Sequence, residues 1–163
     1  RQISPTSPTG YRDNAESGLD SILLGLSFPS ATFLARGFSG NPEQLERLME
    51  AALDHTESKR GFAFLEVLSP CVTYYDTHRE WRAKVYNIDE EEGYDPTDRG
   101  MAFQRSLKLK EQGRIPIGRI FKGEHASLES LILNKTELPP AQHKVGRDGH
   151  REQYEKFIDS YMG

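Results

Sequence analysis

The chain has 163 residues, of which 36% are hydrophobic and 28% are charged, and its 21 basic and 25 acidic residues give a formal net charge of −4. This length fits one domain with an adequate core, and the slight acidic excess argues against nucleic acid as a partner. No apolar stretch approaches the roughly 18 residues that crossing a bilayer requires, so no membrane partner is expected.

The first 18 residues contain no periodic apolar pattern and are rich in proline, serine, threonine and glycine, which predicts a loop. Because the chain begins with Arg1 instead of methionine, we expect it to be the C-terminal piece of a longer protein. A short helix is predicted over residues 18–27, since four apolar residues recur there at helical spacing, and Pro29 ends it. Those residues are Leu19, Ile22, Leu23 and Leu26.

A strand–helix–strand unit follows. The first strand is predicted over residues 31–35, and residues 36–40 are expected to turn the chain. The helix over residues 42–56 is strongly indicated, because Asn41 is a good N-cap and a proline occupies the first helical position. The second strand, residues 62–68, is apolar except for one glutamate, which predicts a strand buried on both faces. Strands joined in this way are parallel.

Beyond residue 76 the apolar content falls. Thr97 is expected to cap a helix over residues 98–112, which Gly113 ends. Residues 115–121 form an extended segment that we expect at a sheet edge, because of its internal proline. Weaker helices are predicted over 77–87, 127–133 and 150–161. We therefore divide the chain into an α/β domain, residues 1–76, and an extended C-terminal arm, residues 77–163, that packs on the domain or on a partner subunit.

Cys71 comes directly after the second strand, at the carboxyl end where open α/β sheets place their chemistry. Two interpretations stay open. A single cysteine is commonly an inert small hydrophobic residue. As a nucleophile it needs a base such as His78, and as a metal ligand it needs further ligands. None of the five histidines forms ligand spacing, and all are expected at the surface.

The residues themselves support a resemblance to a known family. Residues 31–40, the capped helix and residues 61–73, which contain the string Leu-Ser-Pro-Cys-Val-Thr, resemble the thiamine-pyrophosphate-dependent 2-oxoacid:ferredoxin oxidoreductases. The similarity is to the C-terminal half of the β subunit and is nearest to the 2-oxoglutarate branch. Gln2-Ile-Ser-Pro-Thr-Ser-Pro8 resembles the family's Gln-x-Ser-Pro-Thr segment. The resemblance implies a parallel-sheet, thiamine-diphosphate-binding fold with helices on both faces.

The resemblance also implies cofactors and site residues. Cys71 matches the family's Ser-Pro-Cys ligand to a 4Fe–4S cluster, whose other ligands would lie upstream of Arg1. Thiamine diphosphate and Mg²⁺ would be held mainly by upstream residues, with Gln2, Ser4 and Thr6 bordering the cofactor pocket. Catalytic residues are likewise expected upstream. The implied partners are an α subunit, ferredoxin, a 2-oxoacid and coenzyme A.

The implied reaction is the coenzyme A-dependent oxidative decarboxylation of 2-oxoglutarate, or the reverse reductive carboxylation, with electrons passing through the cluster to ferredoxin. Two alternatives remain. The same chemistry could act on pyruvate or a branched-chain 2-oxoacid. A non-catalytic α/β module that only supports assembly, with Cys71 in its core, is the alternative of another class.

Overall fold

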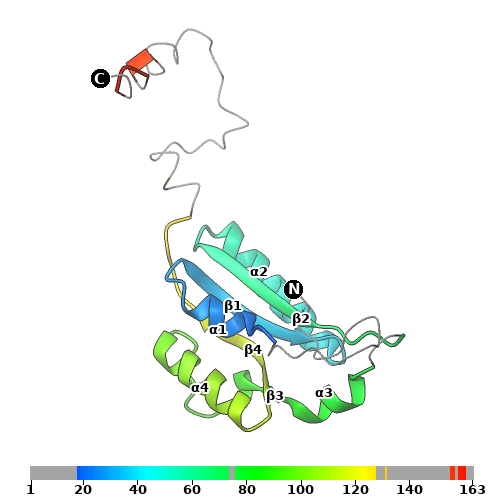
Figure 1. Ribbon diagram of the computed structural model, residues 1–163. Helices are drawn as coiled ribbons and strands as arrows, with labels where there is room; N and C mark the ends of the chain where they lie inside the picture. Colours follow the sequence, from blue (N-terminus) through cyan, green and yellow to red (C-terminus); the bar gives the residue numbers. More distant parts are fainter. Residues whose placement is uncertain (1–17, 74–75, 128–130, 132–154, 157, 161–163) are drawn as a thin grey trace. The chain divides into compact units, whose positions relative to one another are not determined.

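The computed structural model describes residues 18–73, 76–127, 131, 155–156 and 158–160 of the chain. The chain divides into two compact units, residues 1–127 and residues 128–163. The first unit is an α/β fold built on a sheet of four strands (Figure 1). No helix in the described part of the chain has both the length and the apolar character needed to cross a bilayer.

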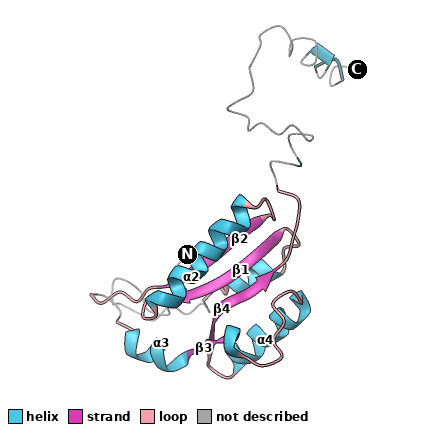
Figure 2. Ribbon diagram, turned by 180° about the vertical axis from the view of Figure 1, so that it is seen from behind, coloured by secondary structure: helices cyan, strands magenta, loops and turns pink. Residues whose placement is uncertain are grey.

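The sheet has the strand order β2-β1-β4-β3, and helices lie on both of its faces. Helix α2 covers one face, while α1 and α4 lie on the other (Figures 1 and 2). The elements in chain order are α1 (Ser21–Leu26), β1 (Ala31–Phe38), α2 (Pro42–Glu57), β2 (Phe62–Leu68), α3 (His78–Lys84), β3 (Val85–Asn87), the 3₁₀ helix η1 (Ile88–Glu90), α4 (Arg99–Glu111) and β4 (Ile115–Lys122).

Strand β1 is the centre of the fold, and all eight of its residues are buried. Its side chains alternate between two cores, as the period of a strand requires. Phe33 and Ala35 pack with Leu48 of α2, whereas Leu34 packs on the other face with residues of α1, α4 and β4. The strand runs three residues beyond the predicted end, so residues 36–38 belong to the sheet and do not begin a turn.

The predicted strand–helix–strand unit is confirmed. Strands β1 and β2 are parallel, and α2 connects them. Asn41 caps α2 as expected, because its side chain accepts a hydrogen bond from the backbone N–H of Gln44 at 3.4 Å. The short helix α1 is also confirmed, and its N-cap is Asp20, which accepts from the backbone N–H of Leu23 at 3.3 Å.

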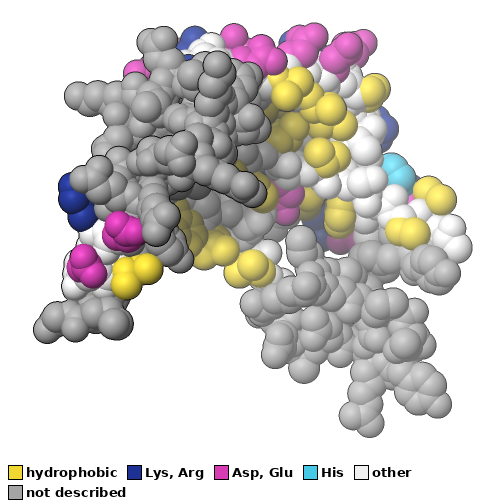
Figure 3. All heavy atoms as spheres, turned by 90° about the horizontal axis from the view of Figure 1, so that it is seen from above, with side chains coloured by type: hydrophobic (Ala, Val, Ile, Leu, Met, Phe, Trp, Pro, Cys, Tyr) yellow, Lys and Arg dark blue, Asp and Glu magenta, His cyan; other side chains and the backbone are white. Residues whose placement is uncertain are grey.

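The expectation that residues 62–68 are buried on both faces is wrong for the described residues. Strand β2 lies at the edge of the sheet, with Phe62 59% exposed and Val67 43% exposed. Met49 and Leu53 of the neighbouring helix α2 are exposed as well. Figure 3 shows exposed hydrophobic side chains beside acidic ones. An apolar run reports which residues suit burial, but the strand order of the sheet decides which strand is covered.

The edge position expected for residues 115–121 is also wrong. Strand β4 lies between β1, with which it is antiparallel, and β3, with which it is parallel. Pro116 fits because β1 pairs with β4 only over residues 118–122, so no ladder to β1 requires an N–H at position 116. The sheet is therefore mixed, and it contains strands from both sides of residue 76.

Gly118 is required where β4 leaves the ladder of β3 and enters that of β1. Its φ of +113° lies in the region that favours glycine, and an added Cβ would come 2.7 Å from a carboxylate oxygen of Asp89. That carboxylate accepts hydrogen bonds from the backbone N–H of Arg119 at 3.1 and 3.2 Å. Asp89, part of the acidic run of residues 89–92, thus fixes the strand locally.

Helix α4 begins one residue later than predicted, because Asp98 and not Thr97 provides the N-cap. Asp98 accepts from the backbone N–H of Met101 at 3.0 Å, while Thr97 donates to Asp95. Gly113 ends the helix with a φ of +71°, as expected. Of the predicted helix over 150–161, residues 155–156 and 158–160 are helical and the others lie outside the described residues, as does most of the predicted helix over 127–133.

Arg99, the first residue of α4, holds the connection between α1 and β1. Its guanidinium donates to four backbone carbonyl oxygens of that connection at 2.7–3.2 Å, and it lies 4.1 Å from the centre of the Phe121 ring. The four carbonyl groups belong to Leu26, Phe28, Pro29 and Ala31. One side chain therefore adds donors to a turn whose own backbone bonds include that from the N–H of Ala31 to the carbonyl oxygen of Phe28.

Replacing Arg99 with methionine should lower the free energy of unfolding by roughly 2–4 kcal/mol, since charge-assisted hydrogen bonds are lost and carbonyl groups are left without donors. Chemical denaturation of the protein measures the change. Lys108→Met, a solvent-exposed residue of the same helix, is the matched control and should change stability by less than about 0.5 kcal/mol. Equal stability of both variants would contradict this role for Arg99.

His55 is buried near the end of α2, with 1% of its surface exposed, so the expectation of a surface position is wrong for this residue. Its Nε2 lies 2.9 Å from the Thr32 hydroxyl, which donates its own proton to the carbonyl oxygen of Phe62. Nε2 must therefore carry a proton and donate it to the Thr32 hydroxyl. Burial, and then the nearby charges of Arg60 and Lys122, lower the pKa of His55.

This lowered pKa makes stability depend on pH. As the pH falls through about 6.5, the unfolded chain takes up a proton at His55 more readily than the folded protein does, so the free energy of unfolding falls as the pH is lowered. We expect a steeper fall between pH of about 7.5 and about 5 for the wild type than for His55→Gln, which retains a donor for Thr32. His125→Gln, at an exposed position, should keep the wild-type slope. If the free energy of unfolding fell with pH equally steeply in the wild type and in His55→Gln, the lowered pKa of His55 would be contradicted.

Candidate functional site

A pocket of about 540 Å³ opens at the carboxyl ends of β1 and β2, where the position of Cys71 led us to expect a site. Residues 68–71, which run from the end of β2 into the following loop, form one wall. The other lining residues come from β1 and β2, from the residues before α1, from α3, and from the end of α4 and the start of β4. Its apolar lining includes Leu19, Leu68, Pro70, Trp81, Ile115 and Pro116, and its charged lining is Asp20, Arg36, Glu66, Glu80, Lys110 and Arg114.

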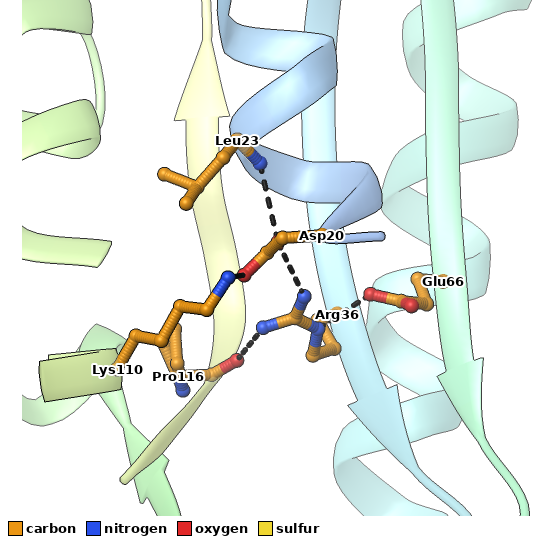
Figure 4. Close-up of polar contacts among 6 residues, drawn as sticks. All are labelled: Asp20, Leu23, Arg36, Glu66, Lys110 and Pro116. Carbon is orange, nitrogen blue, oxygen red and sulfur yellow. Dashed lines mark hydrogen bonds and ion pairs between the residues drawn. The ribbon is translucent and has the colours of Figure 1, made fainter. Parts of the chain in front are cut away.

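Arg36 of β1 connects the elements around this pocket (Figure 4). Its guanidinium donates to Glu66 of β2 at 2.5 Å and to Asp20, the cap of α1, at 3.0 Å. A third N–H points to the carbonyl oxygen of Pro116 at 3.5 Å. Lys110 of α4 lies 3.4 Å from the second oxygen of Asp20. We call Asp20, Arg36, Glu66 and Lys110 the charge network.

The charge network is largely removed from water. The Arg36 side chain is 7% exposed, and those of Glu66 and Asp20 are 13% and 18% exposed, whereas Lys110 is 51% exposed. Burial alone would raise the pKa of Asp20, but the positive charge of Arg36, the N–H of Leu23 and the charge of Lys110 outweigh burial and lower it. Two carboxylates and two cations therefore balance each other beside the pocket.

Backbone and side-chain hydrogen bonds hold the pocket walls together. The N–H of Ser39 donates to the carbonyl oxygen of Leu68 at 3.0 Å, which joins the ends of β1 and β2 just before Cys71. Arg82 of α3 donates to the carbonyl oxygen of Gly40 at 3.2 Å. Arg114 donates to the carbonyl oxygens of Lys84 and Val85. The start of the loop that carries Cys71 is thus joined to the end of β1, and α3 is joined to the loop after β1 and to the segment before β4.

Cys71 is exposed and lines the pocket, while the preceding Pro70 is buried. Within the described residues, no group of three or more histidine, cysteine, aspartate or glutamate side chains is placed to hold a metal ion. This donor set does not fit a metal site made by the described residues alone. It fits a single thiolate ligand that completes a cluster whose other ligands come from elsewhere, as four-cysteine ligation allows.

The other predicted site residues are not brought to this pocket by the described structure. Gln2, Ser4 and Thr6 lie outside the described residues. His78 is not among the residues that line this pocket; its ring nitrogen Nδ1 lies 3.0 Å from the Asp76 carboxylate, and its ring lies against Phe38. His143 and His150 lie outside the described residues.

Sequence reasoning missed the charge network. Arg36 was expected in a turn, and Glu66 was seen only as an interruption of an apolar run. A signal was present, because each apolar strand contains one charged residue, and the two charges have opposite signs. In parallel register Arg36 stands opposite Glu66. The pattern of one unlike charge in each of two neighbouring apolar strands could therefore have predicted a buried ion pair.

Replacing Arg36 with methionine should destabilise the protein by about 3–5 kcal/mol at neutral pH, because two carboxylates lose their buried partner. The loss should become smaller as the pH is lowered toward about 4, where protonation removes the uncompensated charges. Urea unfolding at several pH values measures both effects. Arg47→Met, on the exposed face of α2, is the control. A loss that does not change with pH would contradict the electrostatic explanation.

A family model and several curated proteins match this chain. A family model that describes the C-terminal part of the pyruvate ferredoxin oxidoreductase beta subunit matches residues 71–135, so the match begins at Cys71. Its range contains the α3, β3, α4 and β4 elements that line or support the pocket.

Curated relatives match over most of the chain. A 2-oxoacid:ferredoxin oxidoreductase β subunit of Aeropyrum pernix is 31% identical over 168 residues, covering 91% of this chain and 53% of the relative. A β subunit of the same kind from Saccharolobus solfataricus is 31% identical, with the same coverage of both chains. The 2-oxoglutarate synthase subunit KorB of Methanocaldococcus jannaschii is 35% identical over 80 residues, covering 45% of this chain and 28% of the relative.

The chain spans about half the length of the first two relatives. The matches include the strand–helix–strand unit and the cysteine that the sequence had singled out, and two relatives cover nine-tenths of this chain under the same description. The chain therefore belongs to the family of 2-oxoacid:ferredoxin oxidoreductase β subunits.

Proposed function

We propose that the chain forms part of the β subunit of an enzyme that carries out coenzyme A-dependent oxidative decarboxylation of a 2-oxoacid, or the reverse reaction, and exchanges electrons with ferredoxin. The observation that supports this proposal best is the position of Cys71. An exposed thiol lines a pocket at the carboxyl end of a parallel strand pair, at the first residue of the family match. An α subunit and ferredoxin are the proposed partners.

In this proposal Cys71 supplies one thiolate to a 4Fe–4S cluster, which when bound accepts and donates single electrons. The chain's described residues have two further tasks. Pro70 and the hydrogen bond between Ser39 and Leu68 hold the loop in place. Apolar residues such as Leu68 and Trp81 limit the access of water to the pocket. Thiamine diphosphate and Mg²⁺ are assigned to residues outside the described part, with Gln2, Ser4 and Thr6 at their border.

For the substrate we propose 2-oxoglutarate. The resemblance of the strings around residues 31–40 and 61–73 to the 2-oxoglutarate branch supports this choice, as does the partial match to a relative called 2-oxoglutarate synthase. Pyruvate is the second candidate, because the matching family model is described as pyruvate ferredoxin oxidoreductase. Branched-chain 2-oxoacids complete the set to be compared.

The ligand role of Cys71 is tested by Cys71→Ser in the full-length protein. We expect loss of the broad visible absorption of the cluster and a lower iron content per protein, because the hydroxyl of serine is a poor substitute for a thiolate. Val72→Ser is the matched control, since Val72 is the adjacent residue and is 72% exposed. It should retain the iron content and the spectrum of the wild type.

Unchanged iron content and absorption in Cys71→Ser would contradict the ligand assignment. An intact wild-type protein without iron would instead favour the non-catalytic assembly module. The substrate proposal is tested separately, by comparing the reduction of ferredoxin with 2-oxoglutarate, pyruvate and branched-chain 2-oxoacids in the presence of coenzyme A. Higher kcat/KM for pyruvate than for 2-oxoglutarate would reject the proposed substrate while leaving the reaction class intact.

A further inference from the structure

We propose that the charge network sets the reduction potential of the cluster that Cys71 ligates, an inference that rests on the proposed function. Asp20, Arg36, Glu66 and Lys110 line the same pocket as Cys71. Reduction adds one negative charge to the cluster. A buried positive charge nearby therefore stabilises the reduced form and raises the potential, and a buried negative charge lowers it.

The network and Cys71 line the same pocket and are connected through strand β2. Glu66 lies on β2, the strand that leads directly to Cys71, and Arg36 stands opposite Glu66 in the sheet. The path from Leu68 to Cys71 is held by the hydrogen bond from Ser39 and by the buried Pro70. The buried members of the network, Arg36, Glu66 and Asp20, are held by ion pairs between elements, whereas Lys110 is half-exposed and contacts only Asp20 within the network.

Burial makes Arg36 and Glu66 more effective than the other charges of the pocket. Glu80 is paired with Lys84 at 2.5 Å, and both side chains are about half exposed, so water and salt screen them. Arg114 is exposed and is held by backbone carbonyl groups. The Arg36 and Glu66 side chains are 7% and 13% exposed, which leaves little water between them and the pocket. Their field on the cluster is screened least.

The network also offers two neutralisations with opposite expected effects. Glu66→Gln removes a negative charge with little change in shape, so the potential should shift to more positive values. Lys110→Gln removes a positive charge, so the potential should shift to more negative values. The shift for Lys110→Gln should be the smaller one, because that side chain is 51% exposed. The double variant should return close to the wild-type potential.

The experiment is a redox titration of the complete enzyme with its cluster, followed by electron paramagnetic resonance and visible absorption. Lys108→Gln is the matched control, since Lys108 lies on α4 beside Lys110 and does not line this pocket. It should keep the wild-type potential. Opposite shifts for Glu66→Gln and Lys110→Gln support the inference, whereas a purely structural role predicts no difference in sign between them.

Potentials equal to that of the wild type, or shifts of the same sign, would overturn the inference while leaving the ligand role of Cys71 intact. If Glu66→Gln fails to assemble a cluster, the half-exposed Lys110→Gln still decides the sign. A wild-type enzyme that contains no cluster would overturn the proposed function, and this inference with it. The two failures are therefore distinguished by the iron content of the wild type.

Discussion

The Arg36 guanidinium is the interaction on which the arrangement around the pocket depends. It projects from the fully buried strand β1 and binds Glu66 of β2, Asp20 at the start of α1 and the backbone of β4. A buried cation is tolerated only where such partners compensate for the water it has lost. The four elements must therefore come together for the charge to be stable, and their meeting point is the floor of the pocket that Cys71 lines.

The two faces of the sheet serve different purposes. On the face covered by α2, β1 contributes small and aromatic side chains to an apolar core that includes Leu48. On the face covered by α1 and α4, an apolar core lies beside the charge network, and Arg99 ties α4 to the turn before β1. The second face thus combines packing with fixed charges. A fixed charge near an electron carrier acts on its potential without having to reorganise, which connects the fold to the proposed chemistry.

The predictable part of the site was its location. Cys71 follows an apolar run ended by a proline, and the carboxyl end of a parallel strand is where a pocket was expected and where one is found. The content of the pocket was less predictable. Arg36 was expected in a turn, and neither Lys110 nor Trp81 had been connected with Cys71, because the segments that carry them approach only when β4 joins β1. His55 shows the same limit, since spacing along the chain does not reveal burial between Phe33 and Thr32.

The sequence by itself determined the elements whose signals are local. Asn41 and the following proline specify the start of α2, Gly113 specifies the end of α4, and apolar periodicity specifies the parallel unit of β1, α2 and β2. The tertiary structure decided the neighbours of each strand, because ladder pairing joins residues that are far apart in the chain. It placed β4 beside β1 and left β2 at the edge. It also made Arg36 a buried ion-pair partner. Whether a side chain is buried depends on which elements pack around it, and the residue type alone does not reveal this.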